Sequence, residues 1–415
     1  MSDAKPNAVR YTGVALLADD NQLKRIQSIS SSTDFSEERL LELANKGVAE
    51  VVDTASVSAT VEANDYGSTE NFAAFLGQGI YNSTRTNDYF ITDASFDNAR
   101  VDIVTKTASN DVSLERSMWL GSLYLTSVAM AYSADGIATE TYDFEGEHKR
   151  WFLNTYKNIH AYKADFSTSS VVLISGVDVS SDTPLLLTVG GIIRADVDGG
   201  DTITTNFVSS NTEITTNVSG LTFTSAETFR LITYSSGATF PNLVTTPAGI
   251  GGVRRGMITI SLWNVDGTEE KTLRVSSADI TVDLSREEKV ELGTDKAYFR
   301  QLTRPIEVTM DLDMMDSDLE IYAKLSGNES AFDSDSLNQF SADDFKKTNQ
   351  LLIKIYNTED QRAHSASNLL KMIQIDNCSV SSEEESITVG EDGTVSLSLL
   401  SDGILISGTG LNPIT

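Results

Sequence analysis

Two groups of closely spaced aspartates are the residues of this sequence that most resemble cation ligands. The first group, Asp196, Asp198 and Asp201, lies in the segment DVDGGD. Oxygen ligands at alternate positions are typical of calcium loops, but an EF-hand loop also needs an acidic residue at its twelfth position, and none stands there. We therefore expect this segment to form a turn.

The second group is Asp311, Asp313, Asp316 and Asp318, which could hold a cation weakly. The same spacing fits a strand that leads into a helix N-terminus, where the helix dipole favours carboxylates. With a single cysteine, Cys378, and three histidines, the sequence has few potential ligands for a zinc site. We expect no metal and no other cofactor.

Catalytic motifs are also missing from the places where they would be informative. No Gly-x-Ser-x-Gly elbow, phosphate-binding Gly-Lys loop or dinucleotide fingerprint stands at a strand-to-helix junction. The basic cluster His148, Lys149 and Arg150 could contact an anion or DNA, or it could simply end a hairpin beside Trp151. Carboxylate pairs abound, so a glycosidase-like pair stays open. We expect a protein that is not an enzyme.

The charge balance restricts the possible partners. Sixty acidic residues against 31 basic ones give a formal net charge of −29, so the surface as a whole should repel DNA. Three explanations stay open: simple solubility, a path along which DNA passes without sticking, and adaptation to high salt. A halophilic host is one hypothesis that follows.

Length and hydropathy set the domain count and the compartment. A chain of 415 residues, 40% of them hydrophobic, is long enough for two cores or more. No apolar run approaches the roughly 20 residues of a membrane span, and the N-terminus MSDAKPNAVR lacks the layout of a signal peptide. We expect a soluble, untargeted protein.

An internal repeat organises the elements that would position these residues. At an offset of 249, residues 25–78 align without a gap to residues 274–327. The identical pairs are Arg25 and Arg274, Ser28 and Ser277, Asp34 and Asp283, Ser36 and Ser285, Glu38 and Glu287, Glu42 and Glu291, Leu43 and Leu292, Thr54 and Thr303, Thr60 and Thr309, Ser68 and Ser317, Ala74 and Ala323, and Leu76 and Leu325.

Both copies predict the same order of elements. Each begins with an acidic stretch, at 35–47 and 284–296, and continues with a strand of alternating apolar and polar residues. Ser68 or Ser317 then caps a short helix. Strands follow at Tyr124–Tyr132 and Thr139–Phe144 around an Asp-Gly turn, and in the second copy at Leu370–Val380 and around Asp392-Gly393. Between the copies, residues 166–245 look β-rich, as an insertion, a small module or opening strands of the second copy.

The segments RIQSISSSTDFSEERLLELANKG, RVSSADITVDLSREEKVELG and LYLTSVAMAYSADGIATETYDFEGEHKRWFLN carry a family resemblance. They resemble the major tail tube proteins of long-tailed, siphovirus-like bacterial or archaeal viruses, here with a duplicated tube domain. The family's hairpin pattern falls on Ala138, Thr139, Glu140, Tyr142, Gly146 and Trp151. The second copy has SSEEESITVGEDGTVSLSLL instead, so the hairpin resemblance holds for the first copy only.

The resemblance implies a mainly β fold with two tandem tail-tube-like sandwich or barrel domains, each with one short helix. We expect these domains at 1–165 and 246–415, with the β-rich segment at 166–245 between them. It further implies a virion tail protein, made in the host cytoplasm, that polymerises into stacked rings and forms a conduit for the genome. Three chains could build a pseudo-sixfold ring, and a ring of six chains is the rival.

The implied partners are further copies of the chain, other tail proteins such as tape measure, terminator and baseplate proteins, and DNA in transit, without a membrane. The polar strand faces could equally face the outside solvent, and the acidic stretches could be solvated loops or helical turns. The candidate lumen-facing residues are Ser58, Thr60, Glu62, Glu307, Thr309 and Asp311, and the candidate ring contacts are Glu37, Glu38, Glu42, Arg286, Glu287 and Glu291.

A β-sandwich baseplate or adhesion module that binds a host surface carbohydrate is the alternative. Exposed aromatic residues would favour it, because sugars stack on aromatic rings. Trp119, Trp151 and Trp263 lie in strand-like contexts, where packing in a core is the more common role. Discrete soluble oligomers would support this alternative, and long polymers would support the tube.

Overall fold

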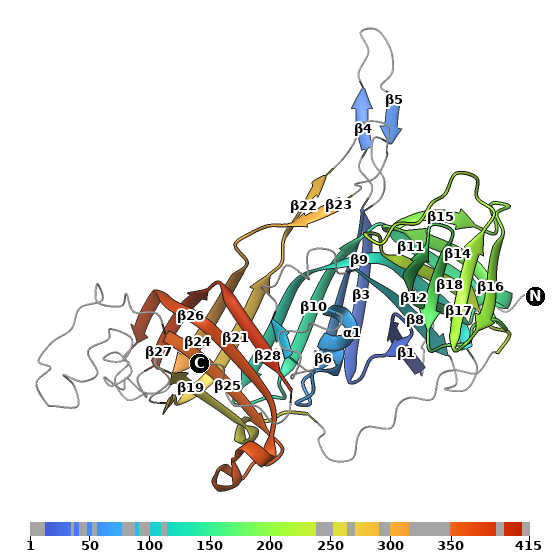
Figure 1. Cartoon of the computed structure of the whole chain (residues 1–415). Coiled ribbons are helices and arrows are strands. Elements are labelled where there is room, and N and C mark those ends of the chain that lie inside the picture. Colours follow the sequence, from blue (N-terminus) through green and yellow to red (C-terminus); the bar gives the residue numbers. More distant parts are fainter. Residues whose placement is uncertain are drawn as a thin grey trace, which may run out of the picture.

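The structure is a computed structural model that confirms a mainly β fold (Figure 1). It describes residues 13–34, 37–40, 48–51, 56–76, 88–90, 100–108, 114–237, 252–263, 270–289, 299–314, 349–386 and 394–408. The described strands form a network of 17 strands, a separate seven-stranded sheet and two small hairpins.

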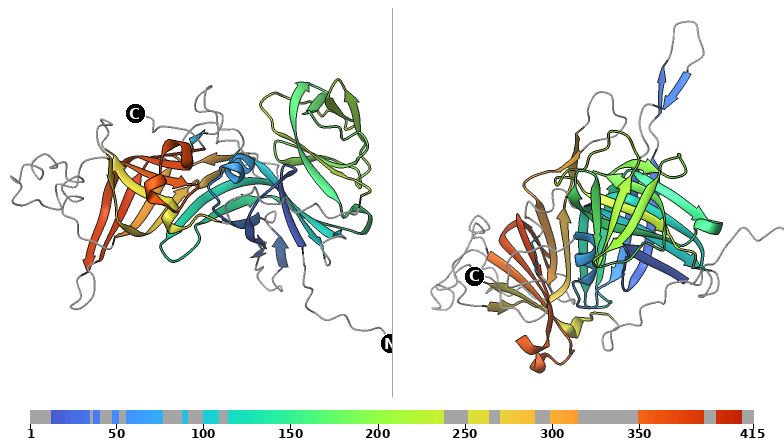
Figure 2. Two further views of the ribbon diagram at one scale, coloured as in Figure 1. Left: turned by 90° about the horizontal axis from the view of Figure 1, so that it is seen from below. Right: turned by 45° about the vertical axis from the view of Figure 1, so that its right-hand side comes forward.

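Eight antiparallel strands of the large network form one continuous sheet, which we call the wall. The order across it is β3, β6, β10, β9, β21, β24, β27, β26, and Figure 2 shows its curvature. The bounds are β3 Ile26–Asp34, β6 Ser56–Asn64, β9 Leu114–Ser133, β10 Thr139–Gly146, β21 Val275–Asp283, β24 Glu307–Met314, β26 Leu369–Ser386 and β27 Thr394–Ser401.

The wall consists of two sets of four strands with the same order. β3, β6, β10 and β9 form the first set, and β21, β24, β27 and β26 form the second. The sets meet where β9 pairs with β21. The offset of 249 carries the bounds of β3 onto those of β21, so the aligned segments occupy corresponding places in the two sets.

Each set has a second sheet behind it, joined through its longest strand. The first half of β9 pairs with β8 and β11, and the first half of β26 pairs with β25 and β28. Ser122 and Asn377, both with positive φ, lie where these strands pass from one sheet to the other. The further strands are β1 Gly13–Ala18, β2 Asn21–Gln22, β7 Asp88–Phe90, β8 Val101–Ala108, β11 His148–Leu153, β19 Ile258–Trp263, β20 Glu270–Thr272, β25 Asn349–Tyr356 and β28 Gly403–Ser407.

Apolar residues at every second position form the core between the wall and these rear sheets. In β6, Val57, Ala59 and Val61 are buried while the residues between them are not, as the alternation predicts. β24 repeats the pattern with Val308, Met310 and Leu312. One large cluster of buried side chains joins both sets, so they share a core.

Residues 159–234 form the seven-stranded sheet, which lies beside the first set (Figure 1). It has its own buried cluster around Val172, Leu187 and Leu231. The predicted domain boundaries stay a prediction. The strands are β12 Ile159–Thr168, β13 Val171–Ser175, β14 Thr183–Val189, β15 Ile192–Asp196, β16 Ile203–Val208, β17 Asn211–Thr216 and β18 Phe229–Tyr234.

The two acidic stretches each contain a described strand, and the hairpins that these strands form extend from the body in a similar direction (Figure 1). β4 (Glu37–Leu40) pairs with β5 (Val48–Val51), and β22 (Arg286–Lys289) pairs with β23 (Phe299–Leu302). In these described residues a strand stands in place of the loop or helical turn that was the alternative to a ring contact.

One α-helix, α1 (Glu70–Leu76), is described, and Ser68 accepts a hydrogen bond from the Glu70 amide near its start. The first helical bond runs from the Ala73 amide to the Thr69 carbonyl, so Thr69 occupies the N-cap position and the predicted cap Ser68 precedes it by one residue. The second predicted helix, after Ser317, and the predicted turn at Asp392-Gly393 lie outside the described residues. Among the described residues, no helix has the length and hydropathy to cross a membrane.

Candidate functional site: a polar face across eight strands

The side of the wall that faces away from the core is a largely polar surface, which we call the polar face, with Ala129, Ala131 and Leu400 as apolar residues on it. All six candidate lumen residues lie on it: Ser58, Thr60 and Glu62 on β6, and Glu307, Thr309 and Asp311 on β24. None of the six is buried. The strand register therefore brings both predicted groups onto one surface, although they are 249 positions apart.

Hydrogen bonds between neighbouring strands cover this face. Thr60 donates to Asp143 at 2.6 Å, and Ser127 donates to the other oxygen of that carboxylate at 2.7 Å. In the second set, Ser277 and Ser396 donate to Asp313 at 2.7 and 2.6 Å. Short hydroxyls therefore hold the carboxylates in place along the surface.

The polar face carries acids without bases. Its positions on the eight strands include ten carboxylates and no lysine, arginine or histidine. Such a surface repels phosphates, and its own strand positions offer no cation to bind them. The ten are Asp34, Glu62, Asp143, Glu145, Asp279, Asp283, Glu307, Asp311, Asp313 and Glu384.

The pKa values of two of these carboxylates are shifted by their surroundings on the face. Partial burial raises the pKa of Asp279, and the charges of Asp311 and Asp313 raise it further. Asp279 is directly opposite Asp311 in the ladder between β21 and β24. The pKa of Asp313 is lowered by the hydroxyls of Ser396 and Ser277, which stabilise its ionised form.

A buried charge cluster joins the two sets behind the wall. Lys371 of β26 is fully buried and forms ion pairs with Asp65 and with Glu140 of β10; the ion pair to Asp65 measures 2.8 Å. Tyr142 donates to Glu140 at 2.7 Å, and Tyr132 donates to Asp65 at 3.1 Å. Glu140 and Tyr142 belong to the hairpin pattern in the sequence, so that pattern anchors the second set to the first.

Burial and charge oppose one another in this cluster. Burial raises the pKa of Glu140, while the Lys371 ammonium lowers it. Burial alone would lower the pKa of Lys371, but Asp65 and Glu140 raise it above its usual value.

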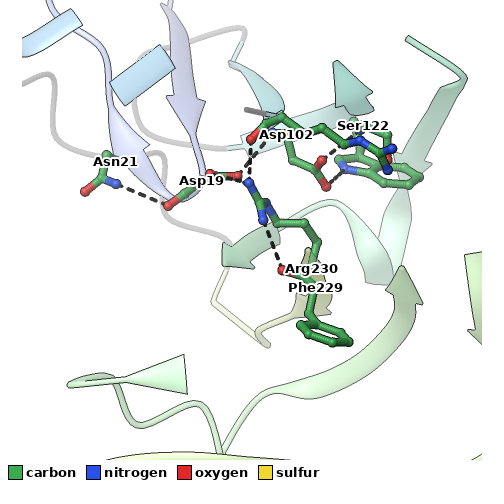
Figure 3. Close-up of polar contacts among 8 residues, drawn as sticks. Asp19, Asn21, Asp102, Ser122, Phe229 and Arg230 are labelled. Atoms are coloured by element: carbon green, nitrogen blue, oxygen red, sulfur yellow. Dashed lines mark hydrogen bonds and ion pairs between the residues drawn. The ribbon is translucent and has the colours of Figure 1, made fainter. Parts of the chain in front are cut away.

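A second cluster attaches the seven-stranded sheet to the first set (Figure 3). Arg230 of β18 donates to both oxygens of Asp19 at 2.8 and 2.9 Å and to the Arg100 carbonyl. Asp102 accepts from the Ser122 amide and from the Trp119 indole, each at 2.8 Å. Burial raises the pKa of Asp102 to about 6, although Arg230 acts to lower it.

The aspartates considered as cation ligands, and the basic residues beside Trp151, contact other residues of this chain in the structure. Asp196, Asp198 and Asp201 lie in a turn, as expected: the Asp196 amide donates to Asp201 at 3.0 Å, and the Asp198 amide donates to Asp196 at 3.1 Å. Arg150 pairs with Asp196 at 3.0 Å. Within the described part of the chain, no group of three or more acidic, histidine or cysteine residues could hold a metal ion.

His148 and Lys149 also contact this chain itself. His148 lies 2.8 Å from the Gly191 carbonyl of the seven-stranded sheet. Lys149 donates to the Ser31 carbonyl at 3.1 Å and lies over the ring of Trp151. Trp119 is fully buried, whereas Trp151 is 56% exposed.

The candidate ring contacts lie in the hairpins. The guanidinium of Arg286 lies 4.7 Å from the centroid of the Tyr124 ring, and Glu287 pairs with Lys289 at 2.7 Å. Glu37 and Glu38 lie in β4, of which the structure describes the backbone only. Glu42 and Glu291 lie outside the described residues. Their role as ring contacts stays a prediction.

Sequence reasoning missed Arg300, which holds the second hairpin against the wall. It pairs with Glu145 of β10 at 2.9 Å and with Glu288 at 2.6 Å, and it is 4% exposed. It also missed Lys371 and Arg230, because their partners lie hundreds of positions away. A lone cation inside an apolar strand, as in LLKMIQI, is the signal that could have indicated Lys371.

No protein-family model matches this sequence, and no curated protein matches it. Among solved structures, the tail of an empty gene transfer agent particle, refined with C6 symmetry, is 12% identical with a TM-score of 0.24, covering 38% of this chain and 98% of that one. The virion of a native gene transfer agent particle has a TM-score of 0.23 at the same identity and coverage.

The tube-terminating cap of the anti-feeding prophage is also 12% identical, with a TM-score of 0.27, covering 41% of this chain and 100% of that one. These neighbours are components of assembled tails and tubes. TM-scores this low give no support for a function.

Proposed function

We propose that this protein is a structural subunit of a viral tail tube, whose polar face lines the conduit through which the genome passes. The observation that carries the proposal is the polar face, with ten carboxylates and no base across eight strands. A lumen of this kind lets a polyanion pass without sticking, because no cation binds its phosphates.

The two strand sets support an internally duplicated tube domain. They share their strand order, and each has a rear sheet that shares its longest strand. Sequence identity at an offset of 249 accompanies this correspondence. One chain then supplies two tube domains, and three chains form a pseudo-sixfold ring.

Strand geometry fits this size. Three chains would contribute 3 × 8 = 24 wall strands. At about 4.8 Å between strands, the wall has a circumference of about 115 Å and a backbone diameter of about 37 Å, before strand tilt widens it. Side chains of about 6 Å on each side leave roughly 25 Å, enough for a duplex about 20 Å wide.

Negative-stain electron microscopy of the purified chain at high concentration tests the proposal. We expect hollow tubes with a regular axial repeat, and more of them at high salt, because salt screens the carboxylates. Symmetry analysis should give three chains per ring. Six chains per ring, each giving one set to the wall, would rule out the three-chain ring, and discrete particles in every condition would rule out the tube.

A carbohydrate-binding adhesion or baseplate module is the second candidate, and the exposure of Trp151 is the observation in its favour. Trp119 does not favour it, since its ring is buried and its indole donates to Asp102. Trp151→Ala should leave tube formation intact if the protein is a tube subunit. Loss of binding to a host-surface glycan in the same variant would favour the adhesion module.

A further inference from the structure

The wall ends in two edge strands. Among the described strands, β3 pairs with β6 alone, and the C-terminal half of β26 pairs with β27 alone. An edge of this length presents a row of backbone donors and acceptors that another strand can complete. These edges are the first strand of the first set and the last strand of the second.

The junction inside the chain shows how such edges fit together. Where the sets meet, the last strand of the first set, β9, pairs antiparallel with the first strand of the second, β21. Met130 and Ile280 are buried on one side of this junction, and Ala131 and Asp279 lie opposite each other on the polar face.

We propose that β3 of one copy of this chain pairs antiparallel with the C-terminal half of β26 of a second copy, repeating the pairing of β21 with β9. The occupant of each edge is thus the other edge of an identical chain. The inference rests on the proposed function in one respect: a tube provides the closed ring in which every edge is filled.

The two ladders determine the register of this junction. The offset of 249 carries Asp279 of β21 onto Ser30 of β3. Asp279 is opposite Ala131. The irregular positions Ser122 and Thr126 of β9 recur 255 positions later on β26, at Asn377 and Ser381, so Ala131 corresponds to Ser386. Ser30 is therefore expected opposite Ser386, with Ser32 opposite Glu384 and Asp34 opposite Ser382. The rows agree, since Ser28 faces the row Glu62, Thr141 and Ala129 in the first set, and Ser277 faces the row Asp313, Ser396 and Glu384 in the second.

Charge complementarity supports the same pairing. The register brings Glu385 opposite Ser31, whose carbonyl accepts a hydrogen bond from Lys149 at 3.1 Å. Among the residues that the structure describes, Lys149 contacts this carbonyl and the Trp151 ring and forms no ion pair. A carboxylate from the second copy would lie near this ammonium group.

Cysteine cross-linking tests the register. Directly opposite residues of an antiparallel pair lie about 4.5–5.5 Å apart at Cα, within the range for a disulfide. Ser32→Cys and Glu384→Cys in separate chains, mixed and oxidised, should give disulfide-linked dimers on non-reducing gels. Both substitutions in one chain should give a ladder that stops at three chains. Cys378 can stay, since it is buried.

Two variants serve as controls. Ala131→Cys with Asp279→Cys should cross-link within the chain and report that the wall has folded. Ser28→Cys with Ser382→Cys is displaced by six residues, about 20 Å along the strand, and should not cross-link.

The outcomes separate this junction from the tube. Tubes without the Ser32–Glu384 cross-link, in protein that forms the internal one, would contradict the proposed junction but not the proposed tube. The cross-link in protein that never forms tubes would support the junction and count against the tube. If folded protein gives neither the cross-link nor tubes, both the junction and the tube are wrong.

Discussion

Lys371 shows how one side chain connects the two halves of this molecule. It is fully buried on β26, in the second set, while Asp65 and Glu140 come from the first. A buried cation with two carboxylates is stable only as a complete group, because each charge left alone keeps its desolvation cost. The cluster therefore stabilises the contact between the two sets.

Replacing this lysine tests how much its ion pairs stabilise the fold. Lys371→Met should lower the free energy of unfolding by about 3–5 kcal/mol near neutral pH, because two carboxylates remain buried without a cation. Burial already raises the pKa of Glu140, and the variant lacks the ammonium that lowers it, so the loss should shrink as the pH falls and Glu140 takes up a proton. Chemical denaturation at several pH values measures this.

The matched control is Lys163→Met, which removes an exposed lysine of β12. It should change stability by less than about 0.5 kcal/mol. A Lys371 variant as stable as this control would show that the ion pairs contribute nothing.

At the scale of elements, β21 and β24 carry like charges opposite each other. Asp279 and Asp311 form a cross-strand pair, and Asp313 is close enough to help raise the pKa of Asp279. Like charges directly opposite destabilise a sheet. The polar face thus keeps an arrangement that weakens the isolated chain, as expected if the surface is needed for its charge.

Asp279→Asn should therefore stabilise the protein at neutral pH by roughly 0.2–1 kcal/mol. The folded pKa of Asp279 is raised, so its charge is unfavourable above that pKa and costs nothing below the unfolded pKa. The gain should vanish in acid and shrink at high salt. Thermal unfolding measures it, with Glu213→Gln of β17, which has Leu173 and Asn206 opposite it, as the control.

At the scale of the whole molecule, the wall has one apolar side and one acidic side. The rear sheets cover the apolar side, and the seven-stranded sheet adds a separate body beside the first set. The polar face is the extended side that stays free of such cover in the single chain. In the proposed ring it faces inward and the rear sheets face outward.

Accessibility in assembled tubes tests this orientation. Thr309→Cys, carrying a small biotin maleimide, should bind streptavidin when the chain is unassembled and should be shielded in tubes, because a lumen of about 25 Å is too narrow for that protein. Lys163→Cys on the seven-stranded sheet should bind it in both states. Equal binding at both sites in intact tubes would place the polar face outside.

Local patterns let the sequence predict much of this fold. Alternation at Val57, Ala59 and Val61 specified a strand and its buried side, because side chains on a strand alternate by geometry. Ser68 marked the start of α1 to within one residue, since caps are local interactions. The repeat at an offset of 249 indicated which segments play equivalent parts.

The sequence by itself thus determined the β class, the repeated elements and the composition of both strand faces, all of which follow from neighbouring residues. Only the tertiary structure decided that β9 pairs with β21, so that two acidic faces become one, and that Lys371 and Arg230 find partners far away in the chain. Strand pairing and buried ion pairs depend on which segments meet in space, and local periodicity contains no information about that meeting.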